Sequence, residues 1–233
     1  LPASGYGSTS NSCAIVRAHY STWDGVAMAY EGFFYWDDWN KYLEVEDERG
    51  MAKYMKTGSI MFMLKGADHS KKSLNLFKEI GVEHEIWDLE TLKKKMPIYS
   101  HDSYNGTSRP DEDDSFFDKS GDQIEGAVWT PGSGYVSDPQ LATHNLQVAT
   151  EAKGGEFLFD AEITEIRQSN GQIQGVTLKS GEQIDCKVLV NVAGPHSFII
   201  NQMAGVEDDM NIKTKALRHE VHHVSSPPGF DFE

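Results

Sequence analysis

Residues 156–194 read EFLFDAEITEIRQSNGQIQGVTLKSGEQIDCKVLVNVAG, and this stretch decides the fold. Apolar and polar residues alternate along EFLFD, ITEIRQ, QIQGVTL and EQIDCKVLVNVAG, which is typical of β-strands. Turn residues at Ser169-Asn170-Gly171 and Ser180-Gly181 predict tight connections between these strands. We therefore predict a β-meander, whose last part, residues 187–193, is mostly apolar and should lie in a covered sheet.

Before the meander, segments in which apolar residues recur at helical spacing are separated by shorter segments without that spacing. Residues 57–64 predict a short buried strand, and residues 100–125 are polar and acidic and predict an irregular surface loop. Gly194-Pro195 should open a further helix after the meander. The predicted helices are 25–43, with a core face of Ala29, Phe33, Trp36, Trp39 and Leu43; 70–81, closed by Gly81; 88–97, capped by Asp88 and stopped by Pro97; and one within 126–155, capped by Asp138 and ended by Gly154-Gly155, with a core face of Leu141, Val148, Ala149 and Ala152.

The composition limits the class of partner. The 233 residues are 39% hydrophobic, and 21 basic against 36 acidic residues give a net charge of −15. Such a charge repels nucleic acid and anionic membranes, so we expect neither as a partner. No apolar run approaches the roughly 20 residues that span a bilayer, and no signal peptide is visible. With only Cys13 and Cys186, far apart in sequence, a reducing, cytoplasmic location is the simplest expectation.

Near its start the chain reads GYGSTSNSCAIVRAHYS, residues 5–21. Small and hydroxyl-bearing residues leave many backbone N–H groups accessible, which suits the binding of phosphates and sugars but also suits an ordinary turn. From these residues alone both interpretations stay open.

Four stretches together resemble the flavin-dependent amine oxidoreductases of the D-amino-acid oxidase superfamily, in its sarcosine oxidase and dimethylglycine dehydrogenase branch. They follow in the order of that family over nearly the whole chain. The stretches are Gly7–Arg17 with His19-Tyr20, similar to the family's loop beneath the flavin; GSGYVSDP at 132–139; Ile163-Thr164-Glu165-Ile166; and VNVAGP at 190–195.

The resemblance implies a mixed α/β fold: an FAD-binding, Rossmann-like domain lacking its first βαβ unit, with the β-meander and part of an interleaved substrate domain. It assigns residues 1–45 and 126–205 to the FAD-binding domain, and residues 46–125 and 206–233 to the substrate domain. The family's GxGxxG motif and the acidic residue that follows it are not in the sequence. We therefore expect an internal fragment of a longer oxidoreductase.

The resemblance also implies site residues. Arg17, His19 and Tyr20 would lie near the flavin ring, where Arg17 could face the reduced flavin or a substrate carboxylate. Asn11 stands where some members carry a histidine linked to the flavin, so the FAD is expected to be non-covalent here. The residues expected to contact the cofactor are Gly7, Ser8, Thr9, Asn11, Ser12, Cys13, Ala14, Ile163, Ala193 and Gly194.

The implied reaction is oxidation of a small amine or N-methyl amino acid, of the sarcosine or dimethylglycine type, by hydride transfer to the flavin. Electrons would then pass to oxygen or to a carrier protein, and a homo-oligomer is a further expectation. Two alternatives stay open. One is a flavin-dependent hydroxy-acid or glycerol-3-phosphate dehydrogenase, and the other is an inactive truncated fragment without bound FAD.

Two patterns that suggest metals are given structural interpretations instead. His219-Glu220-Val221-His222-His223 satisfies HExxH, but Pro227 and Pro228 follow closely and favour an extended segment over the helix that zinc chemistry needs. The acidic run 111–114 lacks the alternating ligands and glycine of a calcium loop and predicts a solvated surface. No metal site is predicted.

Overall fold

The computed structural model describes residues 1–66, 68–105, 109, 111–218, 220–222, 224–225 and 228–229. The chain divides into two units. We call residues 8–155 the helical unit, and residues 1–7 with 156–233 the meander unit. Each is described by itself. Every strand pairing within them is antiparallel among the described residues, and the predicted mixed α/β class is confirmed.

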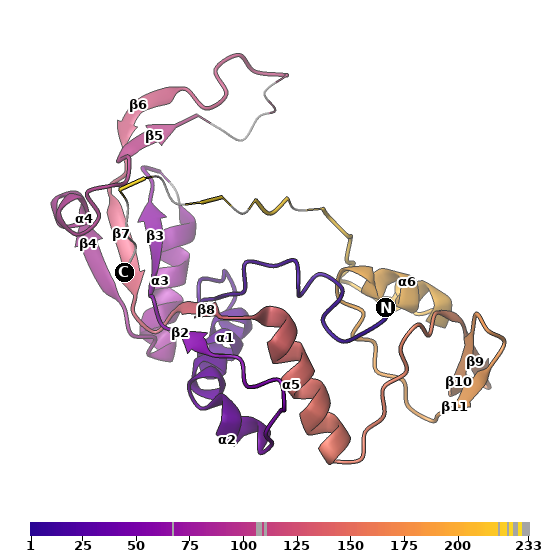
Figure 1. Ribbon diagram of the computed structural model, residues 1–233. Helices are drawn as coiled ribbons and strands as arrows, with labels where there is room; N and C mark the ends of the chain where they lie inside the picture. The colour runs from indigo at the N-terminus through magenta and orange to yellow at the C-terminus, as the bar shows by residue number, and fades with distance from the viewer. Residues whose placement is uncertain are drawn as a thin grey trace. The chain divides into compact units, whose positions relative to one another are not determined.

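An antiparallel sheet of β3 (Ser59–Met63), β7 (Gly126–Thr130) and β4 (Glu85–Asp88) forms the centre of the helical unit (Figure 1). Successive residues of β7 point to opposite faces. Val128 packs with Phe77 of α3 (Asp68–Ile80) and with α1 (Trp23–Asp37), while Ala127 packs with Leu92 of α4 (Leu89–Lys95). Helices therefore cover both faces of this sheet, which explains why β7 is almost entirely buried.

Elements with strong local signals form as predicted. β3 lies in the strand predicted at 57–64, and α3 and α4 correspond to the helices predicted at 70–81 and 88–97. α5 (Pro139–Ala152) corresponds to the helix predicted between the Asp138 cap and Gly154-Gly155. Asp88 Oδ1 accepts the Thr91 N–H at 2.8 Å, and Asp138 Oδ1 accepts the Leu141 N–H at 2.9 Å. These caps satisfy N–H groups that no helix can satisfy internally.

The helix predicted over 25–43 is wrong in one respect, because it is two helices. α1 ends at Asp37, Asp38 leaves helical geometry at φ −126° and ψ 50°, and α2 (Trp39–Leu43) follows. Phe33, Trp39 and Leu43 are buried as expected, but Ala29 and Trp36 are only half-buried.

The core face predicted for α5 is also shifted. Its buried residues are Ala142, Asn145 and Ala149. Leu141 and Val148 are half-buried, and Ala152 is exposed. The prediction missed this because a buried asparagine occupies the middle of the stripe.

The irregular loop predicted at 100–125 contains a hairpin instead, formed by β5 (Asp102–Tyr104) and β6 (Lys119–Gln123). Figure 1 shows this hairpin extending away from the β3-β7-β4 sheet. Its strands are polar, so no apolar alternation marks them, and backbone hydrogen bonds pair them instead. Tyr104 stacks on Phe117 with ring centroids 5.3 Å apart.

A small second sheet in the helical unit joins β1 (Ile15–Val16), β8 (Gly134–Val136) and β2 (Tyr54–Met55). The backbones approach so closely that a Cβ at Gly134 would lie 2.0 Å from the Met55 carbonyl oxygen. Glycine is therefore required at this position, and the sheet holds the opening segment against the start of α5.

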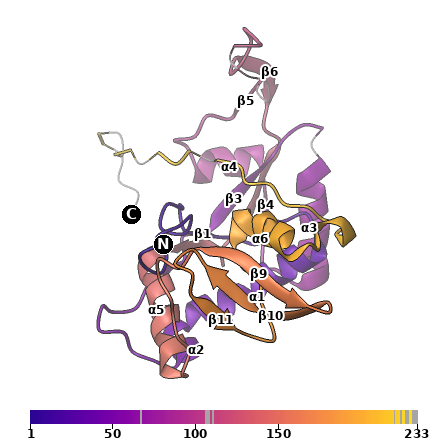
Figure 2. The ribbon, with the colours of Figure 1, turned by 90° about the vertical axis from the view of Figure 1, so that its right-hand side faces the viewer.

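The predicted meander is present in the meander unit as β9 (Ile163–Ser169), β10 (Gln172–Leu178) and β11 (Gln183–Asp185). Asn170 and Gly171 both have positive φ, of 52° and 72°, as a type I′ hairpin turn requires. After the 3₁₀ turn η1 (Gly194–His196), α6 (Ser197–Ala204) lies against the meander (Figure 2), and η2 (Glu207–Asp209) follows it.

Two strands predicted in this unit are wrong. Residues 156–160 and 187–193 form no ladder with any described strand. Residues 188–192 nonetheless alternate: Val188, Val190 and Val192 are 75%, 72% and 84% exposed, while Leu189 packs on the meander core. The apolar pattern is that of a strand, but a strand also needs a neighbour for its backbone hydrogen bonds.

Other expectations fall on the whole chain. Within the described ranges no helix has the length and apolarity needed to cross a membrane, and no group of acidic, histidine and cysteine side chains could hold a metal ion. His219 and His223 of the HExxH pattern lie outside the described residues. Cys13 and Cys186 are free. The assignment of segments to FAD-binding and substrate domains stays a prediction.

A buried asparagine joins α5 to the chain between α2 and β2. The Asn145 amide nitrogen donates to Asp47 Oδ2 at 2.8 Å and to the Gly50 carbonyl at 2.9 Å. Its oxygen accepts the Trp39 indole N–H at 3.2 Å and the Ala52 N–H at 3.0 Å. All four of these hydrogen bonds are inside the protein, because Asn145 has no exposed surface.

We expect Asn145→Ala to lower the free energy of unfolding by about 3 kcal/mol, because buried donors and acceptors lose their partner. Urea unfolding measures this difference. Asn40→Ala, at an exposed position in α2, is the matched control and should change stability by less than about 0.5 kcal/mol. Equal midpoints for the two variants would contradict the role given to Asn145.

Candidate functional site

The opening segment forms a closed turn before it enters β1. Ser12 Oγ donates to the Thr9 carbonyl at 2.8 Å, the Ser12 N–H donates to the same oxygen at 3.1 Å, and the Ala14 N–H donates to Ser12 Oγ at 3.2 Å. Ala14 adopts a left-handed conformation with φ 54°, which is costly for a residue with a Cβ. Such strain persists only where the surrounding structure holds it, and it is frequent at functional sites.

This turn borders a cavity of about 550 Å³ in the helical unit, which we call the loop cavity. Its wall combines the opening segment with one face of α1 and the start of α5. The lining residues are Thr9, Ser12, Ala14, Ile15, Val16, Arg17, Tyr20, Ala29, Gly32, Trp36, Val136, Pro139, Ala142, Thr143 and Leu146. The volume is within the range of sites for small molecules and cofactors.

Gly32 leaves the α1 wall of the loop cavity bare. Ala29, Gly32 and Trp36 line the cavity at helical spacing, and a Cβ built at Gly32 meets no atom within 4 Å. A glycine inside a helix costs up to about 1 kcal/mol relative to alanine. No neighbour excludes a methyl group, so packing does not require glycine at this position. The absence of a side chain leaves this part of the cavity open.

A second cavity, of about 380 Å³, adjoins the first, and we call it the sheet cavity. The two share Arg17 and Tyr20, so these residues separate them. The sheet cavity is lined by Arg17, His19, Tyr20, Ser21, Ser59, Ile60, Met61 and Ser73. It therefore lies against β3 and α3, on the other side of the opening segment.

Arg17 is exposed at the junction of the two cavities. Its guanidinium lies over the Tyr20 ring, 5.8 Å from the centroid, and Nη1 donates to the His19 carbonyl at 3.4 Å. Ser73 Oγ donates to the Tyr20 carbonyl at 3.2 Å and ties this segment to α3. No carboxylate of the described residues forms an ion pair with Arg17, so the guanidinium can bind an anionic ligand.

His19 anchors the same segment to the sheet. Its Nε2 lies 3.0 Å from Ser59 Oγ and 3.3 Å from Thr130 Oγ1, while Nδ1 is buried and has no hydrogen-bond partner among the described atoms. Burial, and secondarily the charge of Arg17, lower the pKa of His19 from 6.5 to about 4. The imidazole is therefore neutral at physiological pH.

The structure brings some of the predicted residues together. Thr9, Ser12 and Ala14 line the loop cavity, Arg17 and Tyr20 line both cavities, and His19 lines the sheet cavity. The remaining predicted positions do not line either cavity. Ser8, Asn11 and Cys13 belong to the same turn, and Gly7, Ile163, Ala193 and Gly194 belong to the meander unit. Cofactor contact by all these residues stays a prediction.

Sequence reasoning missed the residues that other elements contribute. Ala29 and Trp36 were assigned to the core, and Gly32, Thr143, Ser59 and Thr130 were not considered. One signal in the sequence indicates Gly32: a glycine inside a helix lowers helix stability, so its presence in this aromatic-rich segment suggests a functional or packing role. Ser59 and Thr130 carry no such signal, because their importance depends on facing His19 across the sheet.

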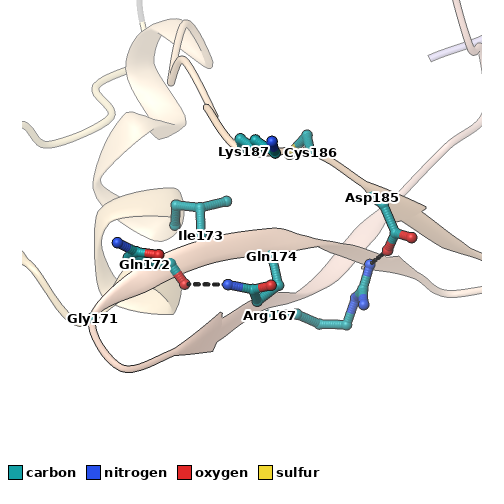
Figure 3. Close-up of a pocket in the computed structure, with 8 residues that line it drawn as sticks. All are labelled: Arg167, Gly171, Gln172, Ile173, Gln174, Asp185, Cys186 and Lys187. Atoms are coloured by element: carbon teal, nitrogen blue, oxygen red, sulfur yellow. Dashed lines mark hydrogen bonds and ion pairs between the residues drawn. The ribbon is translucent and has the colours of Figure 1, made fainter.

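A larger hollow of about 940 Å³ lies on the meander (Figure 3). Arg167 and Lys187 give it basic groups, but Arg167 forms an ion pair with Asp185 at 2.5 Å and so is already neutralised. Gln174 Nε2 donates only within the strand, to the Gln172 carbonyl at 3.5 Å. The paired Arg167 makes this hollow a weaker candidate for an anionic ligand than the cavities around Arg17.

Comparisons with known proteins identify the family of the chain and similar folds. A family model described as FAD dependent oxidoreductase (DAO) matches residues 2–232. L-proline dehydrogenase from P. horikoshii has 20% sequence identity and a TM-score of 0.61, over 82% of this chain and 44% of that one. Glycine oxidase from Geobacillus kaustophilus has 16% identity and a TM-score of 0.61, over 86% and 49%. L-amino acid deaminase from Proteus vulgaris has 14% identity and a TM-score of 0.57, over 83% and 40%.

At these identities the likeness to solved structures shows the fold. This chain spans less than half the length of each of these three proteins. No curated protein matches the sequence.

The shifted pKa of His19 predicts a dependence of stability on pH. The folded-state pKa of about 4 lies below the ordinary value of 6.5, so between these values the unfolded chain binds more protons. The contribution of neutral His19 to the free energy of unfolding is fully present above the unfolded-state pKa of 6.5. It is lost progressively as the pH falls toward 4. His19→Gln should therefore lose less stability than the unaltered protein over this interval.

Urea unfolding midpoints at several pH values between these limits measure the effect. His196→Gln, which changes an exposed histidine of η1, should follow the unaltered protein. Parallel curves for His19→Gln and the unaltered protein would show that His19 titrates normally.

Proposed function

This chain belongs to the family of FAD dependent oxidoreductases, and we propose that it supplies the flavin-facing wall and part of the substrate site of an amine oxidoreductase. The substrate we infer is a small amine that carries a carboxylate, such as an N-methyl amino acid. The observation that carries this proposal is the position of Arg17, which lies between two cavities and forms no ion pair with any described residue.

The residues of the loop cavity fit a flat aromatic cofactor with a polar tail. Ala14, Ala29, Gly32 and Ala142 allow a ring system to approach the backbone, and Gly32 leaves the α1 wall without a side chain. The hydroxyl group of Thr9, together with backbone N–H groups of the turn, can donate to phosphate or ribityl oxygens. FAD held here would supply the hydride acceptor for oxidation of the carbon beside the amine nitrogen.

The sheet cavity suits the amine. As a hydride leaves the N-methyl carbon, the nitrogen lone pair would form the C=N bond. Water would then hydrolyse this imine to an aldehyde and the demethylated amine. Arg17 holds the substrate carboxylate, and the Tyr20 ring beneath the guanidinium fixes its direction. Ile60 and Met61 exclude water from the apolar part of the substrate.

The names of the structural neighbours are consistent with this substrate class, since proline, glycine and L-amino acids are all carboxylated amines. An unpaired Arg17 would equally bind the carboxylate of a hydroxy acid or the phosphate of glycerol phosphate. The electron acceptor, oxygen or a carrier protein, and a homo-oligomeric state remain proposals. A turnover screen of the full-length protein with amines and hydroxy acids separates the two substrate classes.

We expect the full-length protein to purify with the visible absorbance of a flavin. Gly32→Leu should weaken FAD binding by at least about tenfold, because the added side chain fills the cavity. Titration of the apoprotein with FAD measures this change. Met28→Leu, which places leucine at a position 74% exposed on the same helix, is the control and should bind FAD normally.

Arg17→Ala should raise KM for a carboxylated amine by about 10- to 100-fold, because a charge-assisted hydrogen bond is lost. An amine without a carboxylate should be affected much less. Arg49→Ala, at an exposed position outside both cavities, should leave KM unchanged. If both amines respond equally to Arg17→Ala, Arg17 does not bind the carboxylate.

A further inference from the structure

Ser59 and Thr130 face one another directly across the β3–β7 ladder. One nitrogen of His19 lies within hydrogen-bonding distance of both hydroxyl groups, at 3.0 Å and 3.3 Å. The other nitrogen is buried and unpartnered. The imidazole therefore meets hydroxyl groups on one side only, and this asymmetry decides where its proton is held.

The arrangement favours the tautomer that is protonated on Nε2. If the proton were on Nδ1, a buried N–H would have no acceptor among the described atoms, and orphaned buried N–H groups are rare because of their cost. With the proton on Nε2, the single N–H donates to Ser59 Oγ, the nearer of the two hydroxyl oxygens, and Nδ1 is left with only an unused lone pair. The lowered pKa of His19 keeps the ring neutral, and a neutral imidazole carries its single proton on one nitrogen only.

The two hydroxyl groups beside His19 Nε2 differ in access. Thr130 has no exposed surface and does not line the sheet cavity, whereas Ser59 is half-buried and does. A hydroxyl oxygen that accepts a hydrogen bond still has its own hydrogen to donate. For Ser59 the cavity is where that hydrogen can find an acceptor, since no acceptor for it is described within the protein.

We propose that His19 donates from Nε2 to Ser59, and that Ser59 in turn donates into the sheet cavity and binds the substrate carboxylate together with Arg17. The inference rests on the proposed function, and it adds a specificity-determining residue, Ser59, and a positioning residue, His19. Arg17 supplies charge and Ser59 supplies a neutral donor of fixed direction. His19 acts through Ser59 and does not itself transfer a proton in the reaction.

Steady-state kinetics of the flavin-loaded full-length protein test the role of Ser59. Ser59→Ala should raise KM for a carboxylated amine by about tenfold, with kcat within about twofold and no change for an amine lacking the carboxylate. Ser59→Thr keeps the hydroxyl and should keep KM close to the unaltered value. Ser180→Ala, in the turn before β11, should have no effect. An unchanged KM for Ser59→Ala beside a raised KM for Arg17→Ala would overturn this inference and leave the proposed function standing.

The role of His19 is tested by comparing a variant that keeps an N–H donor with one that lacks it. His19→Gln keeps an N–H donor at the end of a side chain and should stay near the unaltered KM, while His19→Leu should resemble Ser59→Ala. Combining His19→Leu with Ser59→Ala should add little, because both remove the same interaction. Additive effects, or a pH–rate profile that loses a limb in His19→Gln, would assign His19 a different role.

One measurement is independent of turnover. In full-length protein labelled with ¹⁵N-histidine, the chemical shifts of His19 should show a protonated Nε2 and an unprotonated Nδ1. Assignment uses the disappearance of these signals in His19→Gln. The opposite tautomer would overturn the inference whether or not the protein oxidises amines. The expected tautomer in a protein that binds no flavin would refute the proposed function alone.

Discussion

The pairing of β1 with β8 is the constraint on which the candidate site depends. Only two residue pairs join these strands, yet they fix the opening turn on one side and the start of α5 on the other. Gly134 also lets β8 pair with β2 on its other edge, since any side chain there would collide with the Met55 carbonyl. Both walls of the loop cavity therefore depend on a three-strand contact that tolerates no Cβ.

The candidate site presents a positive charge, Arg17, whereas the chain as a whole carries a negative net charge. With a net charge of −15, this chain as a whole repels an anion, so the carboxylate of the proposed substrate would have to be attracted locally. Arg17 provides this attraction because no carboxylate of the described residues neutralises it, whereas Arg167 in the meander is paired with Asp185. The neutral His19 contributes to the same balance, since it adds hydrogen bonding beside Arg17 without a second positive charge.

Sequence reasoning succeeded where the cause of a structure is local. Asp88, Asp138 and Gly81 end or begin helices through contacts within a few residues, and the Asn170-Gly171 turn sets its hairpin by backbone conformation alone. It failed where partners are distant in sequence. The hairpin of residues 102–123, the buried Asn145 and the Ser59–Thr130 pair depend on neighbours that periodicity does not reveal. The opening turn was found through its small residues, but the helix face opposite it was not.

The alternation of residues 188–192 has a practical consequence for handling the protein. A segment with one packed face and three bare valines offers unpaired backbone groups and an apolar surface to any extended chain that meets it. Net negative charge keeps molecules apart on average but does not protect one short segment, and no lysine interrupts it. Preparations in which this segment is uncovered will self-associate with rising concentration, and soluble material will require that it be shielded.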